Sequence, residues 1–348
     1  EHGLLHESYG AFAAKRFNSE MIELSDQIFC WGPHDHRFLV TKYPQLADKF
    51  KMTGSPRVDI WRNPLSPPGV DVAGSLDGDY ILFVSNFAIL ARVANGALSQ
   101  DPQADLRSSS GFVLPSHRDE WAYIQSFDKI IRRVHERSPQ LSIVVRPHPT
   151  ESPDWWARKL GDLERVHVTS AGSTSDWVRS ARALLHNGCT TGMEAAFSGT
   201  PVVSFVIKST KREKYFSNRI GTLAVSVEEA TEALIRRVPP LAESAKTPEE
   251  ELSSRIFWHP FRYSCELIVR EWENLLRKPS QALWSRGLSA RQKLWLEGRR
   301  RQRVNSWKSP PLDERTIQDR VQRVSESLGL PTPKVRVFAE RVVEFLPG

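Results

Sequence analysis

Four short apolar runs restrict the fold of this chain more strongly than any other feature of the sequence. They read YILFVSNF, LSIVVRP, RALLHNG and TPVVSFV, at residues 80–87, 141–147, 182–188 and 200–206. Stretches with helical periodicity separate them, including a long amphipathic one at about 119–137. Continuous apolar strands are expected where helices cover both faces of a parallel sheet. The pattern therefore predicts an α/β fold.

The N-terminal part shows the same alternation of helix and strand. We expect helices at 8–24 and 34–48, a strand at 27–32, and a strand followed by a turn at 49–61. The next stretch is rich in Pro, Gly and Asp and is typical of a linker. Because the chain opens within this pattern and without Met, we expect that part of the N-terminal lobe lies upstream. The predicted division is 1–62 for the remainder of an N-terminal lobe, 63–79 for a linker, 80–275 for a second lobe and 276–348 for a basic helical extension.

The C-terminal extension is the most basic part of the chain. The sequence is mainly helical after residue 226, and a break at 309–311 precedes two further expected helices. Within 286–308, aromatic residues are interleaved with cations. One interpretation is a solvated helix face, and the other is a patch for anionic lipid headgroups, where each Lys or Arg contributes about 1 kcal/mol. The lipid interpretation assigns attachment to Trp295, Arg299, Arg300, Arg301, Arg303 and Trp307.

Composition narrows the class of protein. A formal net charge of +7 suits nucleic acid, anionic lipid or phosphorylated substrates. No nucleic-acid-binding motif is present, so nucleic acid is not a predicted partner. The three cysteines lie far apart without zinc-site spacing, which indicates a reducing compartment. No apolar run reaches the roughly 20 residues needed to span a bilayer, and we expect no signal peptide. We therefore predict a cytoplasmic protein, held at the inner face of the cytoplasmic membrane where the basic stretch binds lipid.

The strongest candidate site is a loop between the third run and the following helix. Its residues are Asn187, Gly188, Cys189, Thr190, Thr191 and Gly192. Free backbone N–H groups and the helix dipole at such a position suit a phosphate, and the two threonines add hydroxyl donors. Glu194, in the first helical turn, is a candidate helix cap or ribose ligand. The alternatives are an ordinary N-cap by a threonine and an activated Cys189 thiol.

A second candidate site follows the second run, where Arg146, Pro147, His148 and Pro149 end a buried strand. The prolines restrict the backbone around the imidazole. His148 can donate to a phosphate oxygen, and Arg146 supplies a second cation. The alternative is a rigid turn with a solvent-facing histidine.

Two further patterns carry weaker signals. Glu1 precedes a histidine and a glycine, and its carboxylate is a candidate general base or simply part of a frayed terminus. His34 and His36 have metal-like spacing, but Asp35 between them is better explained as a helix cap. The sequence contains no Asp-x-Asp pattern after a strand, so we predict catalysis without a required metal.

Several of these segments occur in an order that resembles a known family. They read EHGLLHESYG, IFCWGPHDH, KMTGSPRVD, LFVSNF, RPHPTES…W and HNGCTTGMEAAFSGTPVVSF. Together, over roughly residues 1–275, they resemble the bacterial surface carbohydrate biosynthesis proteins of the GT-B glycosyltransferase type. More distantly, they are similar to capsule polysialyltransferases, Kdo transferases and teichoic-acid glycerophosphotransferases.

The resemblance implies two Rossmann-like lobes, with the nucleotide donor on the C-terminal one. It assigns Glu1 as the general base, His148 and Pro149 as contacts to a cytidine nucleotide, and Thr190 and Thr191 as the phosphate loop. The chain departs from the family's acidic-acidic-Gly motif at His2, which stands in the second acidic position.

From this resemblance we expect a metal-independent glycosyltransferase that needs no cofactor. Its donor would be a nucleotide-activated sugar, with a CMP-linked sugar such as Kdo or a sialic-acid-like sugar as the first expectation. Its acceptor would be a cell-surface polysaccharide or a lipid-linked glycan. The alternatives are a CDP-alditol phosphotransferase of the teichoic-acid type and a non-catalytic scaffold subunit of polysaccharide assembly.

Overall fold

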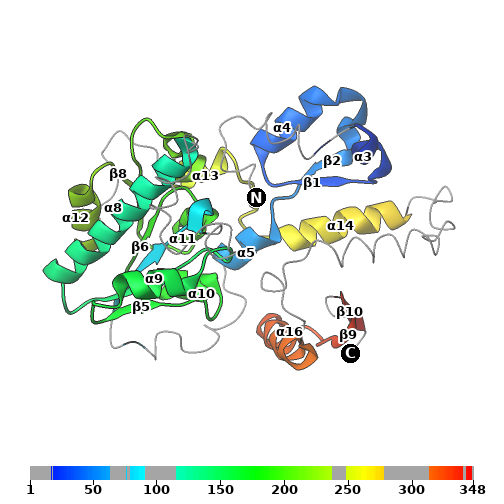
Figure 1. Cartoon of the computed structure of the whole chain (residues 1–348). Coiled ribbons are helices and arrows are strands. Elements are labelled where there is room, and N and C mark those ends of the chain that lie inside the picture. The colour runs from blue at the N-terminus through cyan, green and yellow to red at the C-terminus, as the bar shows by residue number, and fades with distance from the viewer. Residues whose placement is uncertain are drawn as a thin grey trace. The chain divides into compact units, whose positions relative to one another are not determined.

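The computed structural model describes residues 17, 19–62, 76, 79–90, 115–236, 248–277, 313–339 and 342–346, and Figure 1 labels their helices and strands. The chain forms two compact units, which are described in turn. The first holds Glu1–Asn63 and Pro68–Leu267, and the second holds Pro64–Pro67 and Ile268–Gly348. The division that we predicted at residues 62, 80 and 275 stays a prediction.

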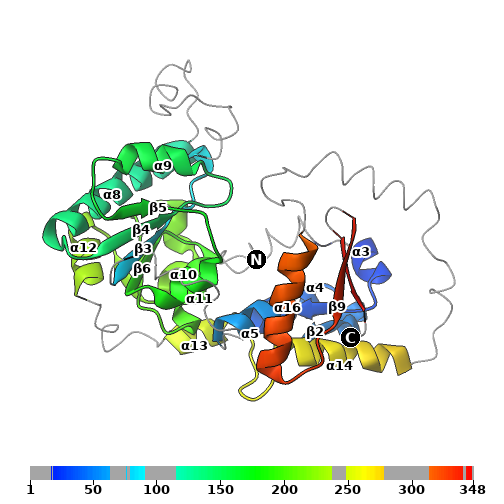
Figure 2. The ribbon, with the colours of Figure 1, turned by 90° about the horizontal axis from the view of Figure 1, so that it is seen from below.

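A six-stranded parallel sheet forms the centre of the first unit (Figure 2). Its strands are β3 (Tyr80–Val84), β4 (Ser142–Arg146), β5 (Val166–Val168), β6 (Ala183–His186), β7 (Val202–Phe205) and β8 (Thr222–Ala224). The spatial order is β5-β4-β3-β6-β7-β8, which is the order of a Rossmann fold. The four apolar runs are β3, β4, β6 and β7, and the predicted α/β class is confirmed. The edge strand β8 was not predicted, because three residues carry little pattern.

Helices cover both faces of this sheet. They are α8 (Pro115–Arg137), α9 (Pro153–Leu160), α10 (Thr174–Ser180), α11 (Thr190–Phe197) and α12 (Val227–Ile235). Ile81 and Phe83 of β3 share a core with α8, α9 and α12. Tyr80, Leu82 and Val84 point to the opposite face and pack with α10 and α11. Both faces of β3 are therefore buried, which explains why its sequence is apolar without alternation.

The strand order reverses between β3 and β6. From β3, the chain adds β4 and β5 on one side of the sheet and β6, β7 and β8 on the other. Ligands of open α/β sheets bind at the carboxyl ends of the strands beside such a reversal. The loops that begin at Ser85 and Asn187 meet this condition, and the loop after β4 lies next to them.

The N-terminal segment of the first unit contains a smaller parallel pair. Its elements are α3 (Ser19–Leu24), β1 (Ile28–Cys30), α4 (Pro33–Lys42), η1 (Pro44–Lys49), β2 (Phe50–Met52) and α5 (Pro56–Arg62). β1 and β2 are parallel and joined through α4, as in a βαβ unit. The turn predicted within 49–61 is instead the helix α5, which begins at Pro56. Proline fits the first turn of a helix, where its missing N–H costs nothing.

The N-terminal segment packs directly on the Rossmann-like part. Val58 and Trp61 of α5 share a core with Met193 of α11, Phe216 and Ile256. The chain returns to this segment after α13 (Pro248–Ser253), where the Phe257 N–H donates to the Trp31 carbonyl at 2.7 Å. At Gly32, a Cβ would lie 2.1 Å from the Arg255 carbonyl oxygen, so only glycine allows this approach.

The second unit begins within α14 (Ser264–Arg277) and contains α16 (Glu314–Leu328) and a hairpin of β9 (Lys334–Ala339) and β10 (Val342–Leu346). Glu314 and Gln318 of α16 accept hydrogen bonds from the N–H groups of Val337 and Val335. Of the two helices expected after the break at 309–311, α16 is present, whereas the expectation of a second helix is wrong because a hairpin follows. The basic stretch 286–308 lies outside the described residues. Within the described part of the chain, no helix is both long enough and apolar enough to cross a membrane.

Candidate functional site

A buried histidine, His186, organises the loop after β6. Its Nδ1 accepts hydrogen bonds from the backbone N–H groups of Gly188, at 3.0 Å, and Cys189, at 3.3 Å. The proton therefore lies on Nε2, which is 2.9 Å from Ser204 Oγ, and that hydroxyl donates to the Ile220 carbonyl. Burial lowers the pKa of His186 to about 3, so the imidazole is neutral at physiological pH.

Two glycines of this loop are required by their neighbours. A Cβ on Gly192 would lie 2.3 Å from Nε2 of His186. Gly188 has a φ of 98°, and a Cβ there would lie 2.6 Å from the Tyr215 ring. The spacing His-x-Gly-x-x-x-Gly thus follows from packing around one imidazole and one aromatic ring.

His186 uses two of the backbone N–H groups that the sequence assigned to a phosphate. The N–H groups of Gly188 and Cys189 already bind the imidazole, so the expectation that they are free is wrong. Helix α11 begins at Thr190, and the hydroxyl and N–H groups of Thr190 and Thr191 lie in its first turn. The positive end of the helix dipole favours an anion there. Phosphate binding by these two residues stays a prediction.

Cys189 precedes the helix as its N-cap residue and is buried. Burial raises the pKa of its thiol, although hydrogen bonds from Thr191 and Gly192 act in the opposite direction. A nucleophilic cysteine needs a lowered pKa and access to the substrate. The alternative of an activated thiol therefore finds no support.

The side chain of Asn187 is the least satisfied polar group near the sheet's reversal. It is 0% exposed, and neither its Oδ1 nor its Nδ2 has a hydrogen-bond partner among the described residues. Ser217 Oγ and Asn218 Oδ1, from the neighbouring η3 (Phe216–Arg219), are likewise buried without partners. Each such group costs about 1–3 kcal/mol. Buried polar atoms without partners are expected at a binding site where the ligand supplies the missing hydrogen bonds.

Arg146, at the end of β4, binds main-chain carbonyl groups of the segment after β5. Its guanidinium donates to the carbonyls of Ala171, at 2.6 Å, and Gly172, at 3.2 Å, and lies 5.8 Å from the Trp177 ring centroid. It is buried, and burial lowers its pKa. Arg146 thus fixes the connection between β5 and α10, and its predicted role as a substrate contact stays untested.

His148 lies on the turn that follows β4. Its Nδ1 accepts a hydrogen bond from the Thr150 N–H at 3.2 Å and lies 2.7 Å from the Thr150 hydroxyl. This pairing places the ring proton on Nε2. The imidazole is half-buried and Pro149 is exposed. The turn therefore fixes the tautomer of His148 so that Nε2 is a donor, as a phosphate contact requires.

Glu151, in the same turn, is a residue that sequence reasoning missed. Its carboxylate accepts from Ser85 Oγ at 2.6 Å, from the Phe87 N–H at 2.6 Å and from Trp156 Nε1 at 3.1 Å. Complete burial raises its pKa to about 7, while these three hydrogen bonds and the charge of Arg212 oppose the rise. Glu151 thereby ties the loop after β3 to the loop after β4. The sequence signal was its place two residues after the RPHP segment.

Glu194 is the fifth residue of α11, so it is not the helix cap that the sequence offered as one role. It is buried, and the Ser175 hydroxyl of α10 donates to its carboxylate. Burial raises its pKa, and the hydrogen bond with Ser175 and the charges of Arg57, Arg179 and Arg146 oppose this rise. In this structure Glu194 joins α10 to α11, and the predicted ribose contact stays untested.

Some of the residues singled out in the sequence cannot be placed, and others can. Glu1 and His2 lie outside the described residues, as do Trp295, Trp307 and the arginines between them. The N-cap residue of α4 is Gly32, and Asp35 caps the helix from its third position, because its carboxylate accepts from the N–H groups of Trp31 and Gly32. Within the described part of the chain, no group of three His, Cys, Asp or Glu side chains has the arrangement of a metal site. Catalysis without a required metal stays a prediction.

Comparison with known proteins yields structural likeness only. No protein-family model matches the chain, and no curated protein sequence is significantly similar to it. A UDP-GlcNAc 2-epimerase of Methanocaldococcus jannaschii, in complex with UDP-GlcNAc and UDP, is 14% identical with a TM-score of 0.45, over 72% of this chain and 62% of that one. The UDP-GlcNAc 2-epimerase of Neisseria meningitidis, bound to UDP-GlcNAc, is 14% identical with a TM-score of 0.45, over 78% of this chain and 68% of that one. The wall teichoic acid polymerase TagF is 10% identical with a TM-score of 0.43, over 73% of this chain and 60% of that one.

The chain thus spans less than two thirds of the M. jannaschii epimerase and of TagF. At these scores and identities the likenesses carry no argument about activity. The fold assignment rests on the strand order and the parallel pairing of the chain itself.

Proposed function

We propose that this chain is the nucleotide-binding part of a GT-B type glycosyltransferase that transfers a sugar from a nucleotide-activated donor to a surface polysaccharide or lipid-linked acceptor. The observation that carries the proposal is the buried, unpartnered amide of Asn187 at the reversal of a Rossmann-ordered sheet. The ordered sequence segments that resemble this family support it.

The site groups suit a nucleotide donor in distinct ways. Thr190 and Thr191, at the start of α11, would stabilise phosphate oxygens through hydroxyl and N–H donors. His148 would add a hydrogen-bond donor to the same charge through its Nε2. The Asn187 amide offers an NH2 donor group and a carbonyl acceptor, which suits a nucleobase edge or a hydroxyl better than a phosphate. Preorganised donors of this kind stabilise a leaving phosphate without a metal.

Other parts of the proposal rest on sequence alone. Glu1 would take the proton of the acceptor hydroxyl, and the basic stretch 286–308 would hold the enzyme at anionic lipid. A cytoplasmic position at the inner face of the membrane follows from that role. The donor class to test first is a CMP-linked sugar.

Calorimetric titration tests the nucleotide site directly. We expect the chain to bind CMP or CDP more tightly than UDP or GDP, with EDTA present, and Mg²⁺ to leave the affinity unchanged. His148→Ala should weaken binding about tenfold or more, the loss expected for one hydrogen bond to a charged group. The matched control is His167→Ala, which removes an exposed imidazole from β5. Tighter binding of UDP or GDP would overturn the donor class, and no binding by the folded chain would overturn the site.

Donor screening then separates the reactions. Incubation with CMP-sugars should give sugar transfer, whereas incubation with CDP-alditols would give alditol-phosphate transfer if the teichoic-acid alternative is correct. Retained glycan binding without turnover of any donor would instead indicate a scaffold subunit.

A further inference from the structure

We propose that Arg212 is the positioning residue of this site, because it joins the two loops on either side of the sheet's reversal. Its Nη1 donates to the Asn187 carbonyl at 3.1 Å, and its Nη2 donates to the Asn86 carbonyl at 2.7 Å. Asn187 follows β6 and Asn86 follows β3, so one guanidinium spans the position where ligands of this fold bind. The identity of the ligand in this inference rests on the proposed function, whereas the bridge between the two loops does not.

The surroundings of Arg212 hold the guanidinium in one place. Its Cζ lies 5.6 Å from the Tyr123 ring centroid and 5.8 Å from that of Phe87. The Asn218 amide donates to its backbone carbonyl at 2.6 Å. Aromatic faces on the side chain and a bond to the backbone leave little freedom of rotation. The fork of Arg212 is therefore a rigid spacer between the two carbonyls.

The charge of Arg212 is only partly balanced in the structure. Its side chain is 12% exposed, and its ion pair with Glu120 is long, at 3.7 Å. Glu151 is close enough to Arg212 to feel its charge, but burial raises the pKa of Glu151 to about 7. A cation that is mostly buried and has one distant carboxylate attracts an anion. An anionic nucleotide bound beside Asn187 would complete this balance.

The geometry depends on a guanidinium rather than on a positive charge. Two N–H groups of a planar fork reach two carbonyls at once, whereas a lysine ammonium is a point charge on a flexible stem. Arg212→Lys keeps the charge and loses the bridge. Arg212→Ala loses both and leaves space that a small guanidinium ion can fill.

Hydrogen exchange and calorimetry together test the inference. In Arg212→Lys, we expect faster amide exchange in the segments 85–90 and 187–193, and an affinity for CMP or CDP that is about tenfold or more below that of the wild type. In Arg212→Ala, added methylguanidinium should restore part of the lost affinity and slow the exchange again. The matched control is Arg132→Lys, because Arg132 also donates to a backbone carbonyl and pairs with Asp128 and Asp162 away from the site.

The outcomes separate this inference from the proposed function. Unchanged exchange in both segments of a folded Arg212→Lys variant would overturn the positioning role, whatever the affinity. If wild-type chain binds no nucleotide, the proposed function fails, while faster exchange in the variant still supports the bridge. Equal affinity of Arg212→Lys and wild type would show that charge alone is sufficient and would also overturn the inference.

Discussion

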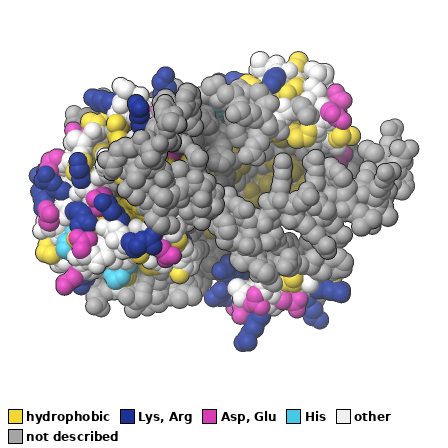
Figure 3. Space-filling view, in the orientation of Figure 1, with side chains coloured by type: hydrophobic (Ala, Val, Ile, Leu, Met, Phe, Trp, Pro, Cys, Tyr) yellow, Lys and Arg dark blue, Asp and Glu magenta, His cyan; other side chains and the backbone are white. Residues whose placement is uncertain are grey.

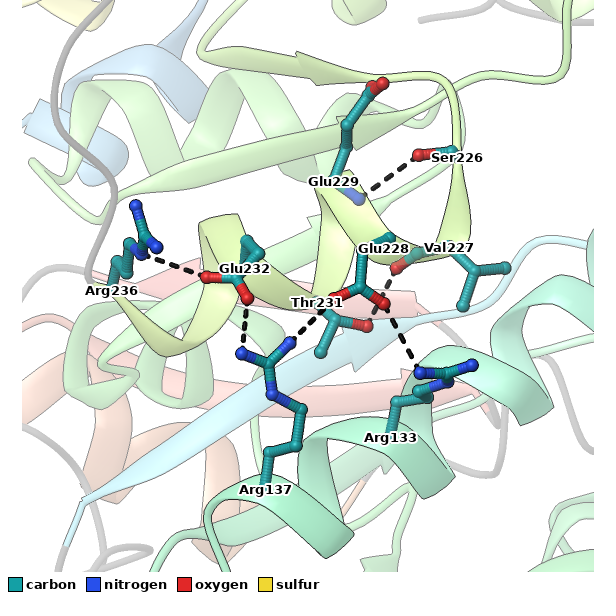
Figure 4. A network of polar contacts seen from close by, with 9 residues as sticks. All are labelled: Arg133, Arg137, Ser226, Val227, Glu228, Glu229, Thr231, Glu232 and Arg236. Carbon is teal, nitrogen blue, oxygen red and sulfur yellow. Dashed lines mark hydrogen bonds and ion pairs between the residues drawn. The ribbon is translucent and has the colours of Figure 1, made fainter.

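Two polar networks in the first unit use the same kinds of side chain in opposite ways. At the strand ends, Glu151 is buried and Arg212 is mostly buried, and both bind backbone groups of loops. On the surface, Arg137 of α8 pairs with Glu228 and Glu232 of α12 (Figure 4). Figure 3 shows basic and acidic side chains interspersed on this part of the molecule.

The difference indicates what each network does. A buried donor that binds a main-chain carbonyl fixes the path of a loop, and its loss leaves a polar group without water. An exposed ion pair joins two helices that already pack through apolar side chains, and water replaces it at little cost. Substitutions at the strand ends should therefore have large effects that depend on geometry, and substitutions on the surface should have small ones.

The largest effect is expected at Gly192. A Cβ at this position would lie 2.3 Å from His186 Nε2, in a fully buried environment, so Gly192→Ala should destabilise the first unit by about 3 kcal/mol or more. Urea denaturation followed by tryptophan fluorescence measures the change.

The control for Gly192 is Gly199→Ala. Gly199 has a φ of 75° but nothing within 4 Å of its added Cβ, so only backbone strain of about 1–2 kcal/mol is expected. In addition, His186→Ala should relieve part of the Gly192→Ala penalty in the double variant. Additive losses in that pair would contradict the role of the imidazole as the obstacle.

The second effect is a pH dependence at Glu151. Its pKa rises from 4.5 to about 7 in the folded state, so the folded protein binds more protons than the unfolded chain between these values. The free energy of unfolding should therefore fall as pH rises from about 4.5 to 7 and level off above it, by up to about 3 kcal/mol. Glu151→Gln should remove this dependence, because an amide does not titrate there.

Denaturation curves at pH 5, 6, 7 and 8 measure the difference between wild type and Glu151→Gln. The matched control is Glu164→Gln, at an exposed position before β5. A constant difference between wild type and Glu151→Gln across this range would show that the carboxyl titrates normally.

Some elements of the fold could be predicted from the sequence and others could not. Continuous apolar runs predicted β3, β4, β6 and β7, because a strand that is buried on both faces has apolar side chains at successive positions. The helix α5 was missed because SPRVDIW contains a proline and no long periodic pattern. The hairpin of β9 and β10 was missed because its strands follow a helical stretch and are partly exposed.

The sequence indicated where the candidate site would lie in the fold but not the contacts of its residues. Residues at strand ends were singled out because the α/β class places ligands there, and their role as ligand contacts stays a prediction. The partners of each residue depend on packing between segments far apart in the chain. The sequence did not show that the guanidinium of Arg146 donates hydrogen bonds to the carbonyls of Ala171 and Gly172. His186 read as part of a strand, and only its contacts with Gly188 and Gly192 explain both glycines.

The third effect should have opposite signs for stability and binding. Asn187→Leu replaces an unpaired buried amide by an apolar group of similar size, so it should stabilise the protein without ligand by about 1–2 kcal/mol. The same variant should lose nucleotide affinity, because the proposed ligand partner of the amide is gone. Loss of stability in Asn187→Leu would indicate that the amide has partners in the folded protein and would weaken the candidate site.

The smallest effect is expected for Arg137→Ala in the surface network. The side chains of Arg137, Glu228 and Glu232 are 40%, 56% and 29% exposed. Their hydrogen bond and charges raise the pKa of Arg137 and lower that of Glu232, but water screens both groups. The two helices also pack through Ile131, Val134 and Leu234, which the substitution leaves intact. Thermal unfolding at low and high salt should therefore show a midpoint near that of the wild type and unchanged nucleotide affinity. A large fall in the midpoint at low salt that disappears at high salt would show that this network does more than bridge two helices already held by their apolar faces.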